Sequence, residues 1–232
     1  LNDNTELFEN IKAKKDLLAE YMQGCSHRIS GRRFTVRLSE LAENLEHKAD
    51  WLTKYLQDHE WIDGESDEGW FNSYYDDHGQ AVEGFFPNEV RMMLTGQVFS
   101  IMGNVASQKQ IRRIVNSADH YLYQKEIGGY RLNTDFHELK FDMGRMFGFA
   151  YGEKENGAVF SHMAVMYANA LYRRGFAKEG WKALKTLAET SLDFDTSRIY
   201  PGIPEYFRSD GRGMYHYLTG AASWFMMTMI TQ

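Results

Sequence analysis

The sequence predicts an all-α fold. Apolar residues recur at helical spacing along most of the 232 residues, and only three prolines interrupt them. N-capping residues and glycines stand where several of these periodic segments begin and end. A chain of this length could form one large domain or two small ones, and the steady recurrence of helix signals favours one helical body.

Two helices and a basic loop are expected in the first part of the chain. Apolar side chains at helical spacing predict a helix over about residues 5–23, which Gly24 can end. Residues 28–37 carry four arginines and several β-prone residues, so we expect a solvated loop or a short hairpin there. Ser39 is a suitable N-cap for an amphipathic helix that runs to about Gln57.

The middle of the chain alternates loops with helices. The run Asp76-Asp77-His78-Gly79 predicts a turn, and it lacks the ligand spacing of a calcium loop, so we expect no metal site. Helices are expected over about residues 88–103 and 107–124. Gly128-Gly129 and the residues after them, to Asn133, are expected to form an irregular connection.

Three more helices and one extended loop are expected toward the C-terminal end. The helices span about residues 162–174, 177–189 and 219–230, and the loop spans residues 199–206. Gly175 suits the C′ position of the first of these helices. Paired helices with alternating short and long connections are typical of an (α/α) toroid.

Composition excludes several classes of function. The net charge of −6 argues against a nucleic-acid surface and against a basic membrane patch. No apolar run reaches the roughly 20 residues of a membrane helix. Cys25 is the single cysteine, so a disulfide framework is excluded; we expect an ordinary, at least half-buried side chain and a cytoplasmic location.

Two segments place groups suited to a phosphate oxyanion near helix N-termini. His162 opens one expected helix, and Thr219 with Gly220 opens another. Unpaired N–H groups and the helix dipole favour an anion at such a position. Each feature alone also has an ordinary explanation, namely a packed or solvated histidine and a threonine N-cap.

Together these segments resemble glycoside hydrolase family 94, the inverting β-glycoside phosphorylases. The resemblance covers about residues 39–232 and rests on four elements. Two of them are Lys154-Glu155-Asn156-Gly157-Ala158-Val159-Phe160-Ser161-His162 and the segment from Gly211-Arg212-Gly213 to Thr219-Gly220-Ala221-Ala222-Ser223-Trp224. The other two are Gly69-Trp70-Phe71-Asn72-Ser73-Tyr74-Tyr75-Asp76-Asp77 and Thr95-Gly96-Gln97-Val98-Phe99. The implied fold is about half of an (α/α)6 barrel. Residues 1–38 would be an N-terminal helix and basic loop inside the catalytic domain, and residues 39–232 the C-terminal half of the barrel; the upstream β-sandwich and the acid-bearing half are expected to be absent from this chain.

The resemblance also implies the site residues. His162, Thr219 and Gly220 would hold the attacking phosphate, and Lys154 would lie at the acceptor subsite. Glu205 would bind sugar hydroxyls, and Gln97 would support the donor side. No Asp-Trp-Asn-Asp segment is present, and Asp50-Trp51 lies on a continuous amphipathic helix. We therefore expect the general acid upstream of Leu1 and the isolated chain to be inactive.

The implied reaction converts a β-linked gluco-disaccharide and phosphate into α-glucose 1-phosphate and glucose, with inorganic phosphate as co-substrate and no cofactor. The expected partners are a β-linked disaccharide or oligosaccharide, phosphate, and the missing half of the same polypeptide, with a homodimer as a further option. Two alternatives stay open. One is an (α/α)6 hydrolase, which would need a second carboxylate to activate water. The other is a non-catalytic helical module that binds a glycan or a protein.

Overall fold

The computed structural model describes residues 10–26, 31, 33–65, 67–200, 202–216 and 219–232. The chain divides into two compact units, Leu1–Leu52 and Thr53–Gln232. The boundary between the two units falls inside helix α3 (Leu38–His59).

The first unit contains helix α2 (Ile11–Cys25) and the first part of α3. Asn10 is the N-cap of α2, and its side chain accepts a hydrogen bond from the backbone N–H of Ala13 at 3.0 Å. Gly24 lies inside this helix and does not end it. Cys25 is exposed, so the expectation of a half-buried cysteine was wrong. Residues 5–9 of the expected helix, with Arg28 and Arg32, lie outside the described residues.

Helix α3 is continuous and includes Asp50-Trp51, as the amphipathic pattern predicted. Ser39 was expected to cap it, but the helix already begins at Leu38. Residues 31 and 33–37 contain no strand, so the described part of the basic segment is a loop rather than a hairpin.

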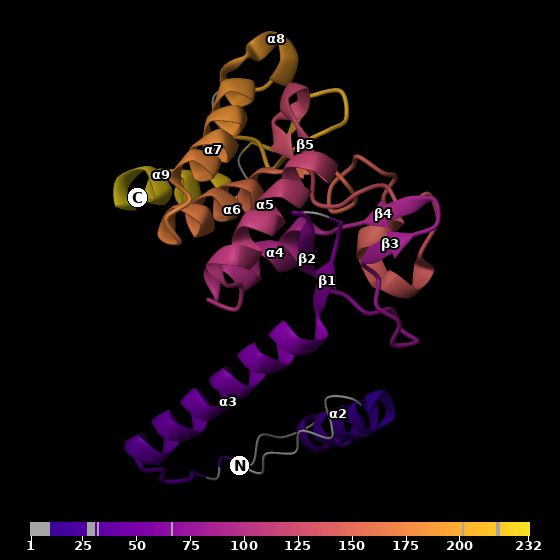
Figure 1. The fold of residues 1–232 in the computed structure, drawn as a ribbon, viewed down its shortest axis with the longest axis vertical. Coiled ribbons are helices and arrows are strands. Elements are labelled where there is room, and N and C mark those ends of the chain that lie inside the picture. The colour runs from indigo at the N-terminus through magenta and orange to yellow at the C-terminus, as the bar shows by residue number, and fades with distance from the viewer. Residues whose placement is uncertain (1–9, 27–30, 32, 66, 201, 217–218) are drawn as a thin grey trace. The chain divides into compact units, whose positions relative to one another are not determined.

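Six helices form most of the second unit, and the expected mostly helical character is confirmed there. They are α4 (Leu94–Met102), α5 (Gln108–Tyr121), α6 (Ser161–Arg173), α7 (Ala177–Leu192), α8 (Phe194–Ser197) and α9 (Ala221–Thr231). Helix α6 is central, because it packs against α4, α7 and α9 (Figure 1). Gly175 takes the left-handed conformation after α6, with a φ of 84°, as expected for a helix C-terminus.

Two helices begin later than expected. The helix predicted from Asn88 begins only at Leu94, because Glu89–Arg91 form strand β4, which pairs with β3 (Gly84–Phe86). The last helix begins at Ala221, two residues after Thr219. The start of α5 agrees with the prediction, because Ser107 and Gln110 form a capping box.

The sequence analysis did not predict four small antiparallel sheets in the described residues. They pair β1 (Trp61–Asp63) with β2 (Gly69–Phe71), β3 with β4, β5 (Tyr123–Gln124) with β6 (Gly129–Tyr130), and β7 (Val159–Phe160) with β8 (Tyr206–Phe207) and β9 (Gly213–Met214). Two segments are 3₁₀ helices, η1 (Lys125–Ile127) and η2 (Phe141–Gly148). The connection expected to be irregular after Gly128 therefore begins with strand β6.

The hydrophobic core of the second unit lies between its helices and these short strands. Fully buried residues include Trp70, Leu94, Ile111, Val165, Leu171, Leu187 and Phe207. A smaller cluster of Val82, Met93, Phe136 and Phe147 fixes the long connection between β6 and β7. Val159 of β7 and Phe207 of β8 belong to the larger cluster, so the core anchors the sheet that precedes α6.

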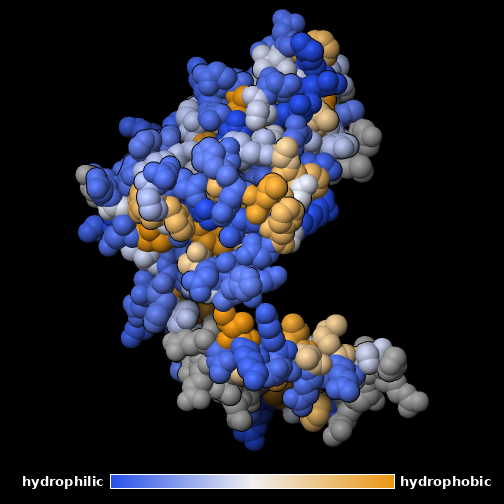
Figure 2. Space-filling model, turned by 90° about the vertical axis from the view of Figure 1, so that its right-hand side faces the viewer, coloured by the Kyte–Doolittle hydropathy of each residue, from blue (hydrophilic) through white to orange (hydrophobic). Residues whose placement is uncertain are grey.

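Many apolar side chains also reach the surface, where they are interspersed with polar ones (Figure 2). In α2 no residue is buried, and Leu18 is 60% exposed. On α9, Met226 is 59% and Ile230 77% exposed. Among the described helices, none combines the length and the apolar character needed to cross a membrane.

Candidate functional site

The N-termini of α6 and α9 meet at His162 and Gly220. His162 is the second residue of α6, and Gly220 is the N-cap of α9. A Cβ added to Gly220 would stand 2.9 Å from Cε1 of the imidazole, so the ring lies directly on the glycine backbone. The structure therefore brings together two of the three residues expected to bind phosphate, which are 58 positions apart in the sequence.

Thr219 completes this pair. Its Oγ1 accepts a hydrogen bond from the backbone N–H of Ala221 at 3.1 Å, which satisfies one of the donors that a helix N-terminus leaves free. A threonine hydroxyl that accepts in this way can still donate its own hydrogen. Gly220 has φ −78° and ψ −2°, so the N–H groups of the first turn of α9 begin at this residue and point away from the helix.

The imidazole of His162 is half-buried and has an unused nitrogen. Its Nε2 is buried and has no hydrogen-bond partner in the described residues. Trp224, one turn into α9, lies beside the ring with 6.0 Å between ring centroids. This burial lowers the pKa of His162 below its usual value. A buried imidazole nitrogen without a partner, beside a helix N-terminus, is suited to an anion that supplies the missing acceptor or donor.

The sheet β7–β8–β9 positions both sides of this site. Phe160 pairs with Tyr206, and Tyr206 pairs with Met214, so the residues next to them in sequence come together. The carbonyl of Glu205 accepts a hydrogen bond from the backbone N–H of Ser161 at 2.9 Å and so caps the start of α6. Glu205 therefore lies next to the segment that carries His162, as the prediction of a shared site requires.

Lys154 projects from a tight turn in the connection before β7. Its φ of 47° is left-handed, and the backbone N–H of Asn156 closes the turn by donating to the carbonyl of Glu153 at 3.0 Å. The Lys154 ammonium lies 5.4 Å from the centroid of Phe149 and 5.1 Å from that of Tyr215. Two aromatic faces thus hold the ammonium, and Tyr215 follows β9 directly in sequence.

Gln97 lies in the core, where it binds backbone groups. It is completely buried in α4, and its Oε1 accepts from the backbone N–H of Phe71 at 2.9 Å. Its Nε2 donates to the carbonyls of Phe71 and Met93 at 2.8 and 3.0 Å. The amide is therefore used to fix β2 against α4, and the structure does not bring it to the site at His162 through any contact.

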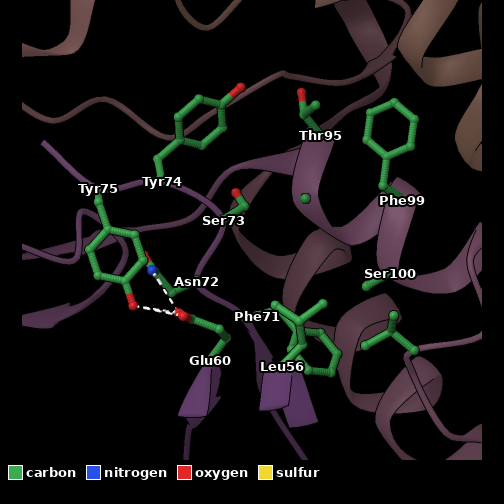
Figure 3. A pocket seen from close by; sticks show the side chains of 12 residues that line it. Leu56, Glu60, Phe71, Asn72, Ser73, Tyr74, Tyr75, Thr95, Phe99 and Ser100 are labelled. Atoms are coloured by element: carbon green, nitrogen blue, oxygen red, sulfur yellow. Dashed lines mark hydrogen bonds between the residues drawn. The ribbon is translucent and has the colours of Figure 1, made fainter. Parts of the chain in front are cut away.

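A hollow of about 460 Å³ lies beside β2 and α4 (Figure 3). Tyr74, Tyr75 and Phe99 give it aromatic walls, and Glu60 and Asn72 give it polar groups. Asn72 Nδ2 donates to Glu60 at 3.0 Å, and the Tyr75 hydroxyl donates to the same carboxylate at 2.7 and 2.8 Å. A concave surface with aromatic walls and few polar groups is typical of a small-molecule site.

A second carboxyl group, Glu83, is buried behind this hollow. It accepts hydrogen bonds from the backbone N–H of Ser73 at 2.8 Å and of Met93 at 2.8 Å, and from the Ser73 hydroxyl. Burial raises the pKa of Glu83 to about 8, although these hydrogen bonds oppose the shift. Glu83 contributes to holding the loop after β2 in place.

The Asp76 side chain closes the turn that follows it. Its Oδ1 accepts from the backbone N–H groups of His78 and Gln80, each at 2.9 Å, which is the hydrogen bonding of an Asx turn. Within the described ranges, no three His, Cys, Asp or Glu side chains lie close enough together to hold a metal ion. The turn itself was predicted from the sequence.

Two aromatic residues of the site were not singled out from the sequence. Trp224 flanks His162, and Tyr215 flanks Lys154. Both lie in the segment between Gly211 and Trp224 that was recognised as a unit. The signal was present, but helical spacing alone does not reveal which aromatic ring faces a site and which faces the core.

Comparison with known proteins finds one family and several relatives. Residues 35–232 match the family described as the glycosyl hydrolase 94 superfamily, catalytic domain. A cellobionic acid phosphorylase from Neurospora crassa is 27% identical over 150 residues, which are 59% of this chain and 19% of that protein. Two proteins from Paenibacillus borealis also match: a solabiose phosphorylase, 25% identical over 72% of this chain and 22% of that protein, and a 3-O-β-D-glucopyranosyl-β-D-glucuronide phosphorylase, 23% identical over 71% and 22%. The chain spans about a fifth of the length of these relatives.

Proposed function

The chain belongs to the glycosyl hydrolase 94 superfamily, and from this membership we propose that it is part of an inverting glycoside phosphorylase. The proposed reaction converts a β-linked gluco-disaccharide and inorganic phosphate into α-glucose 1-phosphate and glucose. Three relatives named as phosphorylases support the reaction class, and their names give three different disaccharides. The identity of the disaccharide is therefore the variable part of the proposal.

The proposal is carried by Nε2 of His162, which lies beside Gly220 and has no hydrogen-bond partner among the residues that the structure describes. A phosphate placed there would receive hydrogen bonds from the imidazole, from the Thr219 hydroxyl and from N–H groups at the start of α9. Hydrogen bonds to an anion inside a partly desolvated site are stronger than those in water. The site thus holds a nucleophile that is already charged and needs no base to activate it.

The bond changes of the reaction follow from this arrangement. An oxygen of the bound phosphate attacks the anomeric carbon and forms a C–O bond on the face opposite to the leaving group. The glycosidic C–O bond breaks, and the leaving oxygen receives a proton from a general acid. A hydrolase of the inverting type would need a second carboxylate to deprotonate water. In the phosphorylase, the cradle of His162, Thr219 and Gly220 takes the place of that base.

The remaining predicted residues have separate roles in this proposal. Lys154, held between Phe149 and Tyr215, would donate hydrogen bonds to the acceptor sugar. Glu205 would bind sugar hydroxyls from the loop before β8. Gln97 would act indirectly on the donor side, because it fixes the backbone of Phe71, which lines the aromatic hollow of Figure 3.

We further propose that residues 39–232 form about half of an (α/α)6 barrel and that the general acid lies outside these 232 residues. No Asp-Trp-Asn-Asp segment occurs in the chain, and Asp50-Trp51 lies within α3. A protein partner would then be the other half of the same catalytic domain. Phosphate would be the co-substrate; because only C–O bonds are exchanged, the reaction requires no redox cofactor. A cytoplasmic location is proposed from the single, unpaired cysteine.

The decisive experiment measures phosphate release from α-glucose 1-phosphate with a panel of glucose-type acceptors. It is performed on the complete polypeptide that contains this chain and, separately, on the 232 residues alone. We expect release by the complete polypeptide, no release by the 232 residues, and a loss of at least about 100-fold in kcat/KM for phosphate in His162→Ala. The control is His78→Ala, which removes an exposed imidazole in the Asp76 turn.

The alternatives give different results. Hydrolysis of a β-linked disaccharide at a rate that does not depend on phosphate concentration would favour the (α/α)6 hydrolase. Sugar binding without turnover by the complete polypeptide would favour a non-catalytic module. Turnover by the 232 residues alone would contradict the placement of the general acid outside this chain.

A further inference from the structure

Helix α9 is apolar on nearly every side. Alanine, aromatic residues, methionine and isoleucine make up most of it, and Met226, Met229 and Ile230 are exposed. A helix of this kind lacks the single apolar stripe that normally selects the face turned to the core. Hydrophobic burial alone therefore does not fix the rotation of α9 against α6, on which it packs (Figure 1).

The inward residues of α9 are spaced by two helical turns. Ala221 and Thr228 are the buried residues of this helix, and they stand seven positions apart. On α6, His162 and Asn169 are also seven positions apart. Residues at this spacing share one face of a helix. The face of α6 that carries His162 therefore also carries Asn169, and the inward face of α9 carries Thr228.

A buried hydrogen bond joins these two faces. Asn169 is 2% and Thr228 1% exposed, and Asn169 Nδ2 donates to Thr228 Oγ1 at 3.1 Å. The hydroxyl of Thr228 donates in turn to the carbonyl of Trp224 at 2.8 Å, so toward Asn169 it acts as the acceptor. Donor and acceptor are thus fixed, and a rotation of α9 would break the bond and leave buried polar groups without partners.

The same hydrogen bonds lead to the phosphate cradle. The carbonyl of Trp224 accepts from the Thr228 hydroxyl, and the backbone N–H of Trp224 donates to the carbonyl of Gly220 at 3.1 Å. The indole of Trp224 lies beside the imidazole of His162, with 6.0 Å between ring centroids. The turn of α9 that flanks His162 is therefore bonded at one end to Gly220 and at the other to Thr228.

The contact at Asn169 lies at nearly the same height on both helices. It comes seven positions after His162 on α6 and eight positions after Gly220 on α9, so the two helices run in the same direction from the cradle. At about 1.5 Å per residue, the bond is roughly 10–12 Å from the two N-termini. A one-residue slip would displace Gly220 from the imidazole by about 1.5 Å, and an error of about 1 Å in a preorganised site costs on the order of 100-fold in rate.

We propose that Asn169 is a positioning residue for the phosphate cradle. Its hydrogen bond to Thr228 fixes the rotation and register of α9 on α6 and so sets the place of Gly220 against His162. A single buried polar group fixes the register of paired apolar helices in coiled coils in the same way. The inference rests on the proposed phosphorylase function, in which this cradle holds the attacking phosphate. Asn169 acts through the two helices and does not touch phosphate.

The test replaces the polar pair by an apolar pair of the same shape. Asn169→Leu, Thr228→Val and the double variant are made in the complete polypeptide that contains this chain. Thr228→Val leaves the buried amide without its acceptor and should lower the unfolding midpoint, whereas the double variant removes both polar groups and should recover most of it. We expect a loss of about 10- to 100-fold in kcat/KM for phosphate in all three variants, including the stable double variant. In the synthetic direction, the KM for the acceptor sugar should stay within a factor of about three of wild type.

Two further variants separate position from stability. Thr186 in α7 is a matched control: its buried hydroxyl also donates to a carbonyl one turn back, that of Lys182 at 2.8 Å, and it contacts the Tyr123 hydroxyl of another element at 3.0 Å. Thr186→Val should lower the unfolding midpoint and leave the phosphate kinetics within a factor of about three of wild type. Thr228→Ser keeps the hydroxyl that accepts from Asn169, so it should retain the phosphate kinetics that Thr228→Val loses.

The outcomes separate this inference from the proposed function. Wild-type phosphate kinetics in a stable double variant, or an equal loss in Thr186→Val, overturns the positioning role and leaves the phosphorylase intact. Absence of phosphate-dependent turnover by the wild-type polypeptide overturns the proposed function instead. In that case, NMR of the His162 ring proton on Cε1 decides, because the Trp224 indole beside it shifts its resonance. A resonance that moves in the double variant and not in Thr186→Val supports the positioning role, and any other pattern overturns it.

Discussion

The imidazole of His162 fills the space that a side chain at position 220 would need. A Cβ at Gly220 would stand 2.9 Å from Cε1 and 3.3 Å from Nδ1 of the ring. The φ of Gly220 is −78°, a value that any residue adopts, so the reason for glycine here is this contact and not backbone conformation. The position of the phosphate cradle thus depends on the absence of one methyl group.

Gly220→Ala should therefore impair phosphorolysis. The added Cβ pushes the ring away from the N-terminus of α9, and a misplaced donor in a preorganised anion site costs roughly 100-fold in rate. We expect a loss of about 10- to 100-fold in kcat/KM for phosphate by the complete polypeptide. The matched control is Gly24→Ala in α2, where an added Cβ meets nothing within 4 Å. Wild-type kinetics in Gly220→Ala would show that the ring is not part of the cradle.

The protonation of His162 should respond to a bound anion. Burial lowers the pKa of its imidazole in the free protein, and a dianion beside it favours the protonated ring. An NMR titration of the ring proton on Cε1 should give a midpoint below 6.5 without sulfate and a higher midpoint with it. If sulfate leaves the titration midpoint of His162 unchanged, the anion does not bind beside this imidazole.

The same lowered pKa makes a stability prediction. In the folded protein His162 takes up its proton only below the unfolded value of 6.5, so the unfolded chain binds the proton first as the pH falls. Its contribution to stability is present above pH 6.5 and is lost as the pH falls through the folded pKa. In denaturant titrations without phosphate, wild type should lose stability below pH 6.5 more steeply than His162→Gln does.

Thr219 should be replaceable by serine but not by alanine. The hydroxyl accepts from the Ala221 N–H and has one hydrogen left to donate to phosphate. Thr219→Ala removes both interactions, so we expect the KM for phosphate to rise by about tenfold and the start of α9 to lose about 1 kcal/mol with the hydrogen bond to Ala221. Thr219→Ser keeps the hydroxyl and should stay within a factor of about three of wild type. Equal effects of the two substitutions would point to the methyl group instead.

Lys154→Met should separate acceptor binding from phosphate binding. The substitution keeps an unbranched side chain of similar length but removes the ammonium, and with it the cation–π contacts with Phe149 and Tyr215. In the synthetic direction we expect the KM for the acceptor to rise by about tenfold, with little change in the KM for α-glucose 1-phosphate. Lys178→Met, at the exposed start of α7, is the control. A rise in both KM values, for the acceptor and for α-glucose 1-phosphate, would indicate that Lys154 contacts the phosphate and not the acceptor alone.

Glu83 should make the protein less stable as the pH rises. Burial raises its pKa from 4.5 to about 8, so the folded state keeps a proton that the unfolded chain releases between these values. The resulting loss is at most about 1.4 kcal/mol for each pH unit in that window, and it ends near pH 8. Denaturant titrations from pH 5 to 9 should show this slope in wild type and not in Glu83→Gln. A slope that persists in the variant would assign the titration to another group.

The sequence was a good guide to helices and a poor one to short strands. Amphipathic spacing located α5 and α7, because each of these helices has one face in the core. The central helix α6 is buried on several sides, and its end was marked by Gly175. The strands span only two or three residues each, too short for an alternating pattern to appear. β4, which spans only Glu89–Arg91, was taken for the start of a helix for this reason.

The site was predictable only in part, and the reason is again physical. His162, Thr219 and Gly220 stood out because each one marks the start of a helix, where an anion is favoured. The close approach of the ring to Gly220 depends on how α6 packs on α9, which spacing along one chain does not reveal. The roles of Trp224 and Tyr215 became visible only when their partners were in place. The buried position of Gln97 follows from its contacts with β2 and not from any pattern in its own helix.

The pairing of β7 with β8 also bears on the order in which the protein folds. The chain leaves this sheet at Phe160 and returns to it at Tyr206, after α6, α7 and α8. Closing so long a loop is entropically costly, and the packing of α6 on α7 shortens the span to be closed, so we expect these two helices to pair first. The cradle would then assemble only after this helical hairpin has formed. A substitution that loosens the hairpin, such as Leu187→Ala in its buried seam, should slow the recovery of phosphate binding during refolding more than the recovery of helical circular dichroism.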